Sequence, residues 1–263
     1  MKEILILPRL AELVIHEYMH LPIGGKEVVC PYYINKFKER AGLRVLVGKG
    51  DPGEIVKEVR VWAKLKDFDV EKASVEQIRE FMISRGIGID CSGFVVHIIG
   101  YLIKCTRKKH LQNYLKFPKN DLLNRLRRLL RPVENMGADM LTSELNCRKI
   151  NNLNNVRPGD FIRSKGKIKN AHHIMLVRRV TKIEGVTTEI EYVHSSRYYE
   201  DQNGIRFGLI KVVDPLKPLA EQKWLENLAG KNYTFETFLN QVEDNGIRRL
   251  KNVRIPYEVI VNN

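Results

Sequence analysis

One cysteine in this chain is placed where a thiol can act as a nucleophile. Cys91 follows Asp90 and precedes Ser92 and Gly93, and an apolar run continues from there to Ile103. Asp is a favourable helix N-cap residue, so we expect Cys91 in the first turn of a buried helix. Free backbone N–H groups and the positive end of the helix dipole favour a thiolate there. The pattern therefore predicts a nucleophile, with an ordinary buried thiol as the alternative.

Two later histidines are spaced so that they can serve such a nucleophile. His173 opens one apolar run and His194 ends the next, and a turn at Glu184-Gly185 separates the two runs. In an antiparallel pair centred on that turn, the two histidines fall within about two positions of each other, and directly opposed residues have Cβ atoms roughly 4.5–5.5 Å apart. The pairing predicts a catalytic imidazole held by a second one. Turn register alone leaves His172 open as an alternative to His173.

A competing motif lies near the N-terminus. Residues 16–20 read His-Glu-Tyr-Met-His and fit the pattern H-E-x-x-H. On a helix, His16 and His20 would share a face and could bind zinc, with Glu17 as general base. A zinc site also needs a third ligand, and Pro22 breaks the helix directly afterwards. We therefore keep a zinc metallopeptidase as an alternative, and predict neither a metal nor another cofactor.

Three segments, in this order, resemble the motifs of the NlpC-like cysteine peptidases, papain-like enzymes that cut cell-wall peptides. Residues 90–95, Asp-Cys-Ser-Gly-Phe-Val, resemble the nucleophile motif. Residues 157–162 with the strand that His173 opens resemble the second motif, and residues 192–196 resemble the third. The resemblance covers about residues 75–215. It implies an α+β, papain-like fold in which the nucleophile helix packs on an antiparallel sheet.

The resemblance also implies roles for the three central residues. Cys91 would be the nucleophile, His173 the acid and base, and His194 the residue that orients the imidazole. Such a triad cleaves an amide through a thioester intermediate. The implied substrate is a peptidoglycan-like peptide or another isopeptide-type amide. A catalytically inactive basic binding protein on the same fold is the remaining alternative.

Three further residues are implied as substrate-binding. Asp90 and Ser92 would hold the amine of the substrate. Tyr32, in the pair Pro31-Tyr32, would be the counterpart of a tyrosine that lines the oxyanion site in this family. Its distance in sequence from Cys91 is longer than the family pattern, so the oxyanion donor stays open. The backbone N–H of Cys91 is one candidate.

The elements that must position these residues follow from local patterns. A capping box at residues 74–77 predicts a helix to about Ser84, and a second amphipathic helix is expected over residues 9–20. Alternating apolar residues predict an antiparallel meander with strands 160–163, 174–181, 188–195 and 205–213. Shorter strands are expected at 28–29 and 43–47, helices at 224–228 and 235–242, and a final strand at 253–261.

The domain organisation has one unusual feature, a basic insertion. Residues 1–73 are expected to form an N-terminal extension packed on the catalytic domain, and residues 74–263 to form that domain. The insertion, at about 104–149, holds twelve Lys and Arg against four Asp and Glu. Its leucine-rich stretch at 122–130 predicts an amphipathic helix with a basic face. It is either a lid that contacts a polyanion or a solvated helical hairpin.

Composition narrows the class of protein. The 263 residues carry a net charge of +14, which suggests an anionic partner or a heavily solvated surface. The four cysteines form no C-x-x-C pair, so we expect reduced thiols rather than a disulfide framework or a cysteine-rich zinc site. No apolar run reaches the length of a membrane span and no secretory signal is seen. We therefore expect a soluble cytoplasmic protein, with its oligomeric state open.

Overall fold

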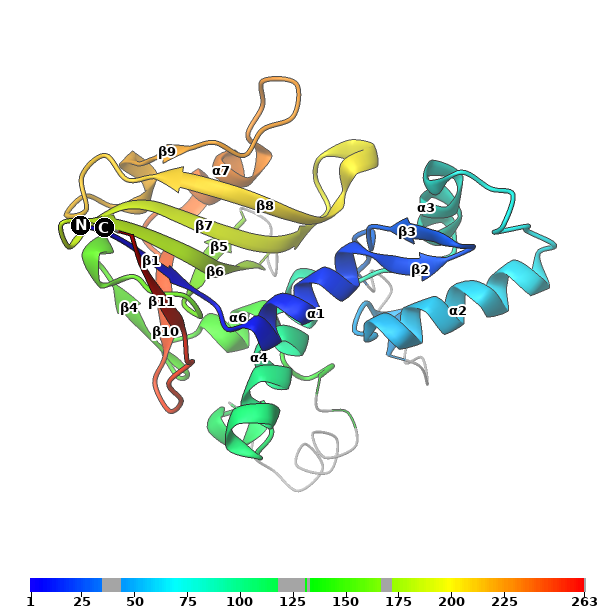
Figure 1. Cartoon of the computed structure of the whole chain (residues 1–263), viewed down its shortest axis with the longest axis horizontal. Helices are drawn as coiled ribbons and strands as arrows, with labels where there is room; N and C mark the ends of the chain where they lie inside the picture. Colours follow the sequence, from blue (N-terminus) through cyan, green and yellow to red (C-terminus); the bar gives the residue numbers. More distant parts are fainter. Residues whose placement is uncertain (35–43, 118–130, 132, 167–171, 263) are drawn as a thin grey trace.

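A large antiparallel sheet organises the molecule (Figure 1). The computed structural model describes residues 1–34, 44–117, 131, 133–166 and 172–262, and within these the sheet has nine strands. Its main path runs β4 (Cys147–Ile150), β10 (Gly246–Leu250), β5 (Phe161–Lys165), β6 (His172–Ile183), β7 (Val186–Ser196), β8 (Gly204–Lys211) and β9 (Lys223–Trp224). The predicted meander is confirmed, because each of its four strands lies within or overlaps one of β5 to β8.

The hairpin of β6 and β7 has the turn that the sequence predicts. Glu184 and Gly185 have positive φ angles of 52° and 80°, as a two-residue hairpin turn requires. From this turn the ladder runs back to the pair Leu176–Val193, where β6 and β7 cease to pair with each other. Each strand continues on its other side, β6 along β5 and β7 along β8. The unpaired ends of β6 and β7 therefore leave room for another element between them.

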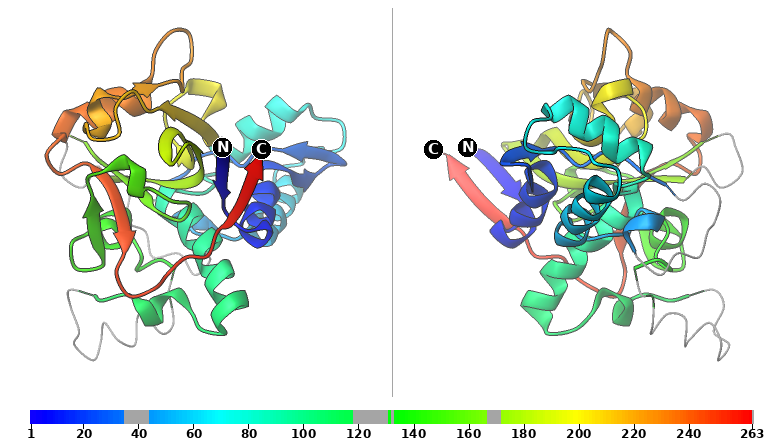
Figure 2. Two further views of the ribbon diagram at one scale, coloured as in Figure 1. Left: turned by 60° about the vertical axis from the view of Figure 1, so that its left-hand side comes forward. Right: turned by 90° about the vertical axis from the view of Figure 1, so that its right-hand side faces the viewer.

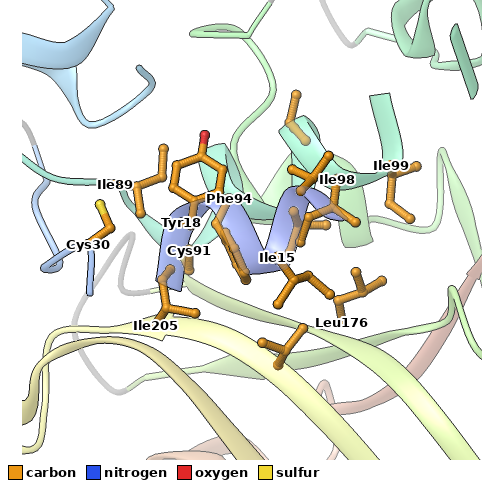
Figure 3. Packing of buried hydrophobic residues seen from close by; sticks show 14 of the residues in the cluster. Ile15, Tyr18, Cys30, Ile89, Cys91, Phe94, Ile98, Ile99, Leu176 and Ile205 are labelled. Atoms are coloured by element: carbon orange, nitrogen blue, oxygen red, sulfur yellow. The ribbon is translucent and has the colours of Figure 1, made fainter. Parts of the chain in front are cut away.

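Helix α4 (Cys91–Arg107) is the buried helix that the apolar run predicts. It contacts α1 (Arg9–Met19), β6 and β7, and its apolar residues join the larger of two buried clusters. Tyr18 of α1 meets Phe94 of α4 edge to face, with ring centroids 5.4 Å apart. Figure 3 shows Cys91 among the labelled residues of this cluster, which include Ile89 and Ile205. The α+β class is thus confirmed, with a helix packed on an antiparallel sheet.

A second group of elements lies beyond α1. It contains α2 (Pro52–Leu65), α3 (Val75–Ser84) and the small hairpin of β2 (Leu21–Ile23) and β3 (Lys26–Val28) (Figure 1). The capping box at Ser74 is confirmed, because its side chain accepts from the N–H of Gln77 and the Gln77 side chain accepts in return. The strand expected at 43–47 is wrong for the described part, since Val45–Val47 form a 3-10 turn. Gly48, at a φ of 71°, closes that turn.

The C-terminal part departs most from the sequence-based prediction. The helix expected at 224–228 is wrong, because Trp224 pairs with Ile210 in the sheet and the N–H of Leu225 donates to Leu209 at 2.8 Å. Backbone pairing with β8 here overrides the helical spacing of the apolar residues. The helix expected at 235–242 starts earlier, as α7 (Tyr233–Phe238). The final strand, expected at 253–261, is shorter, as β11 (Glu258–Asn262).

The N-terminal residues join the same sheet. β1 (Lys2–Ile6) lies between β6 and β11 and pairs with both. The chain ends therefore lie side by side, as Figure 2 shows from two directions. Of the basic insertion, the described parts include the end of α4, the short helix α6 (Ala138–Thr142) and β4, whereas the leucine-rich stretch lies outside the described residues. In the described parts of the chain, no helix is both long enough and apolar enough to cross a membrane.

Candidate active site

The start of α4 is built as the sequence predicts. Asp90 is the N-cap, and its Oδ1 accepts from the N–H of Gly93 at 2.6 Å. Gly93 leaves room for the neighbouring chain segment, since a Cβ atom there would lie 2.8 Å from the carbonyl oxygen of Gly48. That close contact places Lys49 directly beside the helix N-terminus. The first turn of α4 is thus fixed by local capping and by a segment distant in sequence.

Cys91 lies where β6 and β7 part. Its Sγ contacts the carbonyl oxygen of His172 at 3.9 Å, on the edge of β6 that no longer pairs with β7. From the side of β7, the Oγ of Ser195 donates to the carbonyl oxygen of Ile89 at 2.8 Å. The N-terminus of α4 is therefore attached to both strands, and Cys91 lies against the backbone that flanks His173.

The Cys91 thiol is neutral in this state. The residue is 5% exposed, and burial, followed by the negative charge of Asp90, raises the thiol pKa to about 12. The expectation of a thiolate stabilised by the helix N-terminus is therefore wrong for the free protein. Loss of hydration outweighs the helix dipole, whose effect is about 0.3–1 kcal/mol at exposed sites. A base must accept the proton when the thiol reacts.

The two histidines meet as their register predicts. Nε2 of His173 and Nδ1 of His194 are 2.7 Å apart, so one donates to the other. If the ladder continued beyond the pair Leu176–Val193, the two histidines would lie two positions apart along the strands. Their side chains bridge this offset. His172 faces elsewhere, with Nδ1 3.7 Å from Oδ1 of Asp139. Of the two adjacent histidines, His173 is the one that meets His194.

Behind His194 lies a buried carboxylate that the sequence did not single out. Oε1 of Glu226 is 3.0 Å from Nε2 of His194 and accepts from Nε of Arg206 at 3.1 Å. Its Oε2 accepts from the hydroxyl of Tyr192 at 2.8 Å. Burial alone would raise the pKa of Glu226, but His194, Tyr192 and Thr234 lower it to about 2. Glu226 is therefore ionised at neutral pH.

The only signal for Glu226 in the sequence was weak. It is one acidic residue in the segment Trp224–Leu228, whose spacing predicts an amphipathic helix. In the structure the residue follows β9 and points into the sheet, where its side chain is 1% exposed.

The ionised carboxylate sets the tautomers of both imidazoles. A carboxylate can only accept, so when both rings are neutral the single proton of His194 is on Nε2 and Nδ1 of His194 has a lone pair. Nε2 of His173 must then donate to that lone pair. Loss of hydration and the neighbouring His194 lower the pKa of His173 to about 3, so its ring is neutral. It follows that Nδ1 of His173 is the free basic nitrogen.

Asp90 and Ser92 are bound to a cation of the chain itself. Nζ of Lys49 lies 2.8 Å from Oδ1 of Asp90 and 2.5 Å from Oγ of Ser92, and Ser92 donates to Asp90 at 2.9 Å. All three side chains are buried. The Lys49 ammonium thus occupies the position that the resemblance assigns to the amine of a substrate. Sequence reasoning missed Lys49, since nothing local connects it to the motif.

The segment of Tyr32 reaches the residues just before α4 despite the long separation in sequence. Its segment forms a parallel bridge with Ile89, and its N–H donates to Oδ1 of Asn203 at 3.2 Å. Burial raises the pKa of the Tyr32 hydroxyl, and the negative charges that Cys91 and Asp90 can carry raise it further. The guanidinium of Arg197 acts electrostatically on both Tyr32 and His173. Tyr32 and Arg197 therefore both lie near the reactive groups.

Residues 158–160, the Pro-Gly-Asp of the second motif, form a structural loop. Asp160 accepts from the N–H of Arg157 at 3.0 Å and from the guanidinium of Arg249 at 2.6 and 2.7 Å. Gly159 has a φ of 88°, and a Cβ atom there would lie 2.5 Å from Ile255. The motif turns the chain into β5, which pairs with the part of β6 that carries His173.

The H-E-x-x-H motif lies apart from these residues. The rings of His16 and His20 stack with centroids 3.9 Å apart, and His20 ends α1 with Nδ1 2.9 Å from the carbonyl oxygen of His16. Nε2 of His20 is 3.9 Å from Glu27. Among the residues with described positions, no group of three or more His, Cys, Asp or Glu is arranged to hold a metal ion.

Comparisons with known proteins give no assignment. The chain matches no protein-family model, no curated protein and no solved structure. The geometry of the site and the resemblance of its short motifs are therefore the features that bear on function.

Proposed function

We propose that this protein is a cysteine peptidase or amidase of the NlpC-like, papain-like type. One observation carries the proposal: Cys91 is fixed against the backbone flanking His173, and an ordered series of hydrogen bonds leads from His173 through His194 to Glu226. A nucleophile, a base with a defined free nitrogen and an orienting partner are the parts that such catalysis needs.

In the proposed reaction, Nδ1 of His173 accepts the proton of the Cys91 thiol. The sulfur attacks the carbonyl carbon of an amide, and a C–S bond forms. The C–N bond then breaks as the imidazolium of His173 protonates the leaving nitrogen, which leaves a thioester on Cys91. Water attacks the thioester, His173 accepts its proton and returns it to the sulfur, and the acid is released.

Glu226 assists the steps in which His173 is charged. Its negative charge raises the pKa of His173, so it stabilises the imidazolium relative to the neutral ring. It also fixes the tautomer of His194, which orients the ring of His173. The oxyanion that forms on the substrate has two candidate donors, the backbone N–H of Cys91 and the neutral hydroxyl of Tyr32.

The substrate class follows from the resemblance, with one departure. The position expected to bind a substrate amine, between Asp90 and Ser92, holds the ammonium of Lys49. The proposal therefore assigns these two residues to holding the helix N-terminus, rather than to substrate binding. Peptides with blocked amino termini should be substrates as readily as those with free ones.

The test is a panel of γ-linked and α-linked peptides, each with a free and a blocked amino terminus. Wild-type protein should cleave at least one of them, and Cys91→Ala should abolish cleavage. Cys105→Ala changes a cysteine on the same helix and should leave the rate unchanged. Rapid acid quench followed by mass spectrometry should find the acyl group on Cys91.

Three results would contradict the proposal. Cleavage by Cys91→Ala at the wild-type rate would exclude the cysteine mechanism. Cleavage that a zinc chelator and His16→Ala both abolish would favour the metallopeptidase instead. Binding of peptides without cleavage by any preparation would favour the inactive binding protein.

A further inference from the structure

A basic pocket lies at the end of the sheet opposite the candidate active site. Its volume is about 540 Å³, and β1, β4, β6, β10 and the loop before β5 all contribute to it. Lys182, on β6, lines it and is nine residues from His173, a separation of about 30 Å along a strand. The basic residues among its described lining are Arg148, Lys149, Arg157, Lys182 and Arg249, and no acidic residue lines it.

Two of these cations are held in place by the fold. The guanidinium of Arg249 forms a two-fold contact with Asp160 and donates to the carbonyl oxygen of Asn155 at 2.6 Å. Nζ of Lys182 donates to the carbonyl oxygen of Asn154 at 2.8 Å. Asp160 neutralises only one of these positive charges. The pocket as a whole therefore stays strongly positive.

The other two arginines have no carboxylate partner among the described residues. Arg148 lies directly opposite Arg249 in the pairing of β4 with β10, a like-charge pair that destabilises a sheet. Arg157 loses hydration and also faces Arg249, and these effects lower its pKa, although the nearby charge of Asp160, which is bound to Arg249, partly offsets them. A bound anion would remove this repulsion.

We propose that this pocket binds a doubly charged phosphoryl group, such as that of pyrophosphate or a phosphomonoester. The guanidinium groups of Arg148 and Arg157 supply the donors that bind phosphate in pairs, and Lys182 and Arg249 add fixed positive charge. A hollow with convergent cations fits a compact anion. Tyr257 is the only aromatic residue in its described lining, so stacking of nucleic-acid bases contributes little.

The test measures binding of inorganic pyrophosphate to the full chain by calorimetry. Arg148→Gln and Arg157→Gln should each weaken binding about tenfold, the effect of losing one charge-assisted contact. Arg60→Gln is the matched control. It removes the same charge from an exposed arginine on α2, outside the pocket, so binding should change less than about twofold. Binding should also fall as salt rises.

Two outcomes would overturn the proposal. One is pyrophosphate binding that neither arginine variant weakens, with circular dichroism showing intact folds. The other is no pyrophosphate binding alongside tight binding of a single-stranded oligonucleotide, which would make this a surface for nucleic acid. Peptide cleavage by the arginine variants should match the wild type, so this test is independent of the proposed function.

Discussion

Replacement of Glu226 by glutamine is the sharpest probe of the proposed mechanism. Gln has nearly the same shape, so the bonds to His194 and Arg206 can keep an oxygen acceptor while the new amide faces Tyr192. Both imidazole tautomers should then persist. What disappears is the negative charge that stabilises the imidazolium of His173.

The size of the effect follows from the contacts that Glu226 makes. A hydrogen bond to a charged group contributes about 1.5–3 kcal/mol and one between neutral groups about 0.5–1.5 kcal/mol. The difference of about 1–2 kcal/mol applies to the step in which His173 is charged, and it corresponds to a fall of about 5–30-fold in kcat/KM. Tyr192→Phe removes only a neutral donor to Glu226 and should cost less.

The pH profile separates a chemical role from a purely structural one. The charge of Glu226 raises the pKa of His173, so its removal lowers that pKa. The acid limb of kcat/KM, where protonation of His173 stops it from acting as a base, should therefore move to lower pH. The assay is peptide cleavage across pH, with urea unfolding as a check on stability.

Glu191→Gln is the matched control for loss of a carboxylate. Glu191 is also on the sheet, but it pairs with Arg178 and Arg179 instead of a histidine. The Glu191→Gln variant should leave kcat/KM unchanged. Wild-type kcat/KM in Glu226→Gln, or an acid limb that moves to higher pH, would refute the assignment of Glu226.

Three further predictions concern the rest of the site. His173→Ala should lower kcat/KM by about 10²–10⁴-fold and His194→Ala by less, measured on a γ-linked peptide; the reverse order would move the base to His194. Lys49→Met should lower the free energy of unfolding by about 3 kcal/mol in urea titrations, because it leaves the buried charge of Asp90 without its cation. An unchanged unfolding midpoint would show that Asp90 is satisfied without it. Elemental analysis of the purified protein should find no stoichiometric zinc; about one zinc per chain, lost in His16→Ala, would revive the metallopeptidase alternative.

Much of the site could be predicted because it depends on local sequence. The helix start at Asp90 needs only a side chain three residues from the N–H group that it caps, and the capping box at Ser74 is equally local. The hairpin turn sets the register of β6 and β7, and that register brings His173 to His194. Short-range geometry therefore determined the start of α4 and the histidine pair.

Tertiary structure alone decided the surroundings of these residues. Glu226 reaches His194 because β9 pairs with β8, a pairing that the helical spacing of residues 224–228 concealed. Lys49 and Tyr32 reach the N-terminus of α4 through contacts between segments far apart in sequence.

The same long-range packing set the ionisation of the cysteine. Position on the helix predicted a lowered thiol pKa, but burial of Cys91 among segments from across the chain raised it to about 12. Burial depends on which distant side chains exclude water, and local periodicity does not carry that information. Sequence thus determined which groups could react, and the tertiary structure decided their charge.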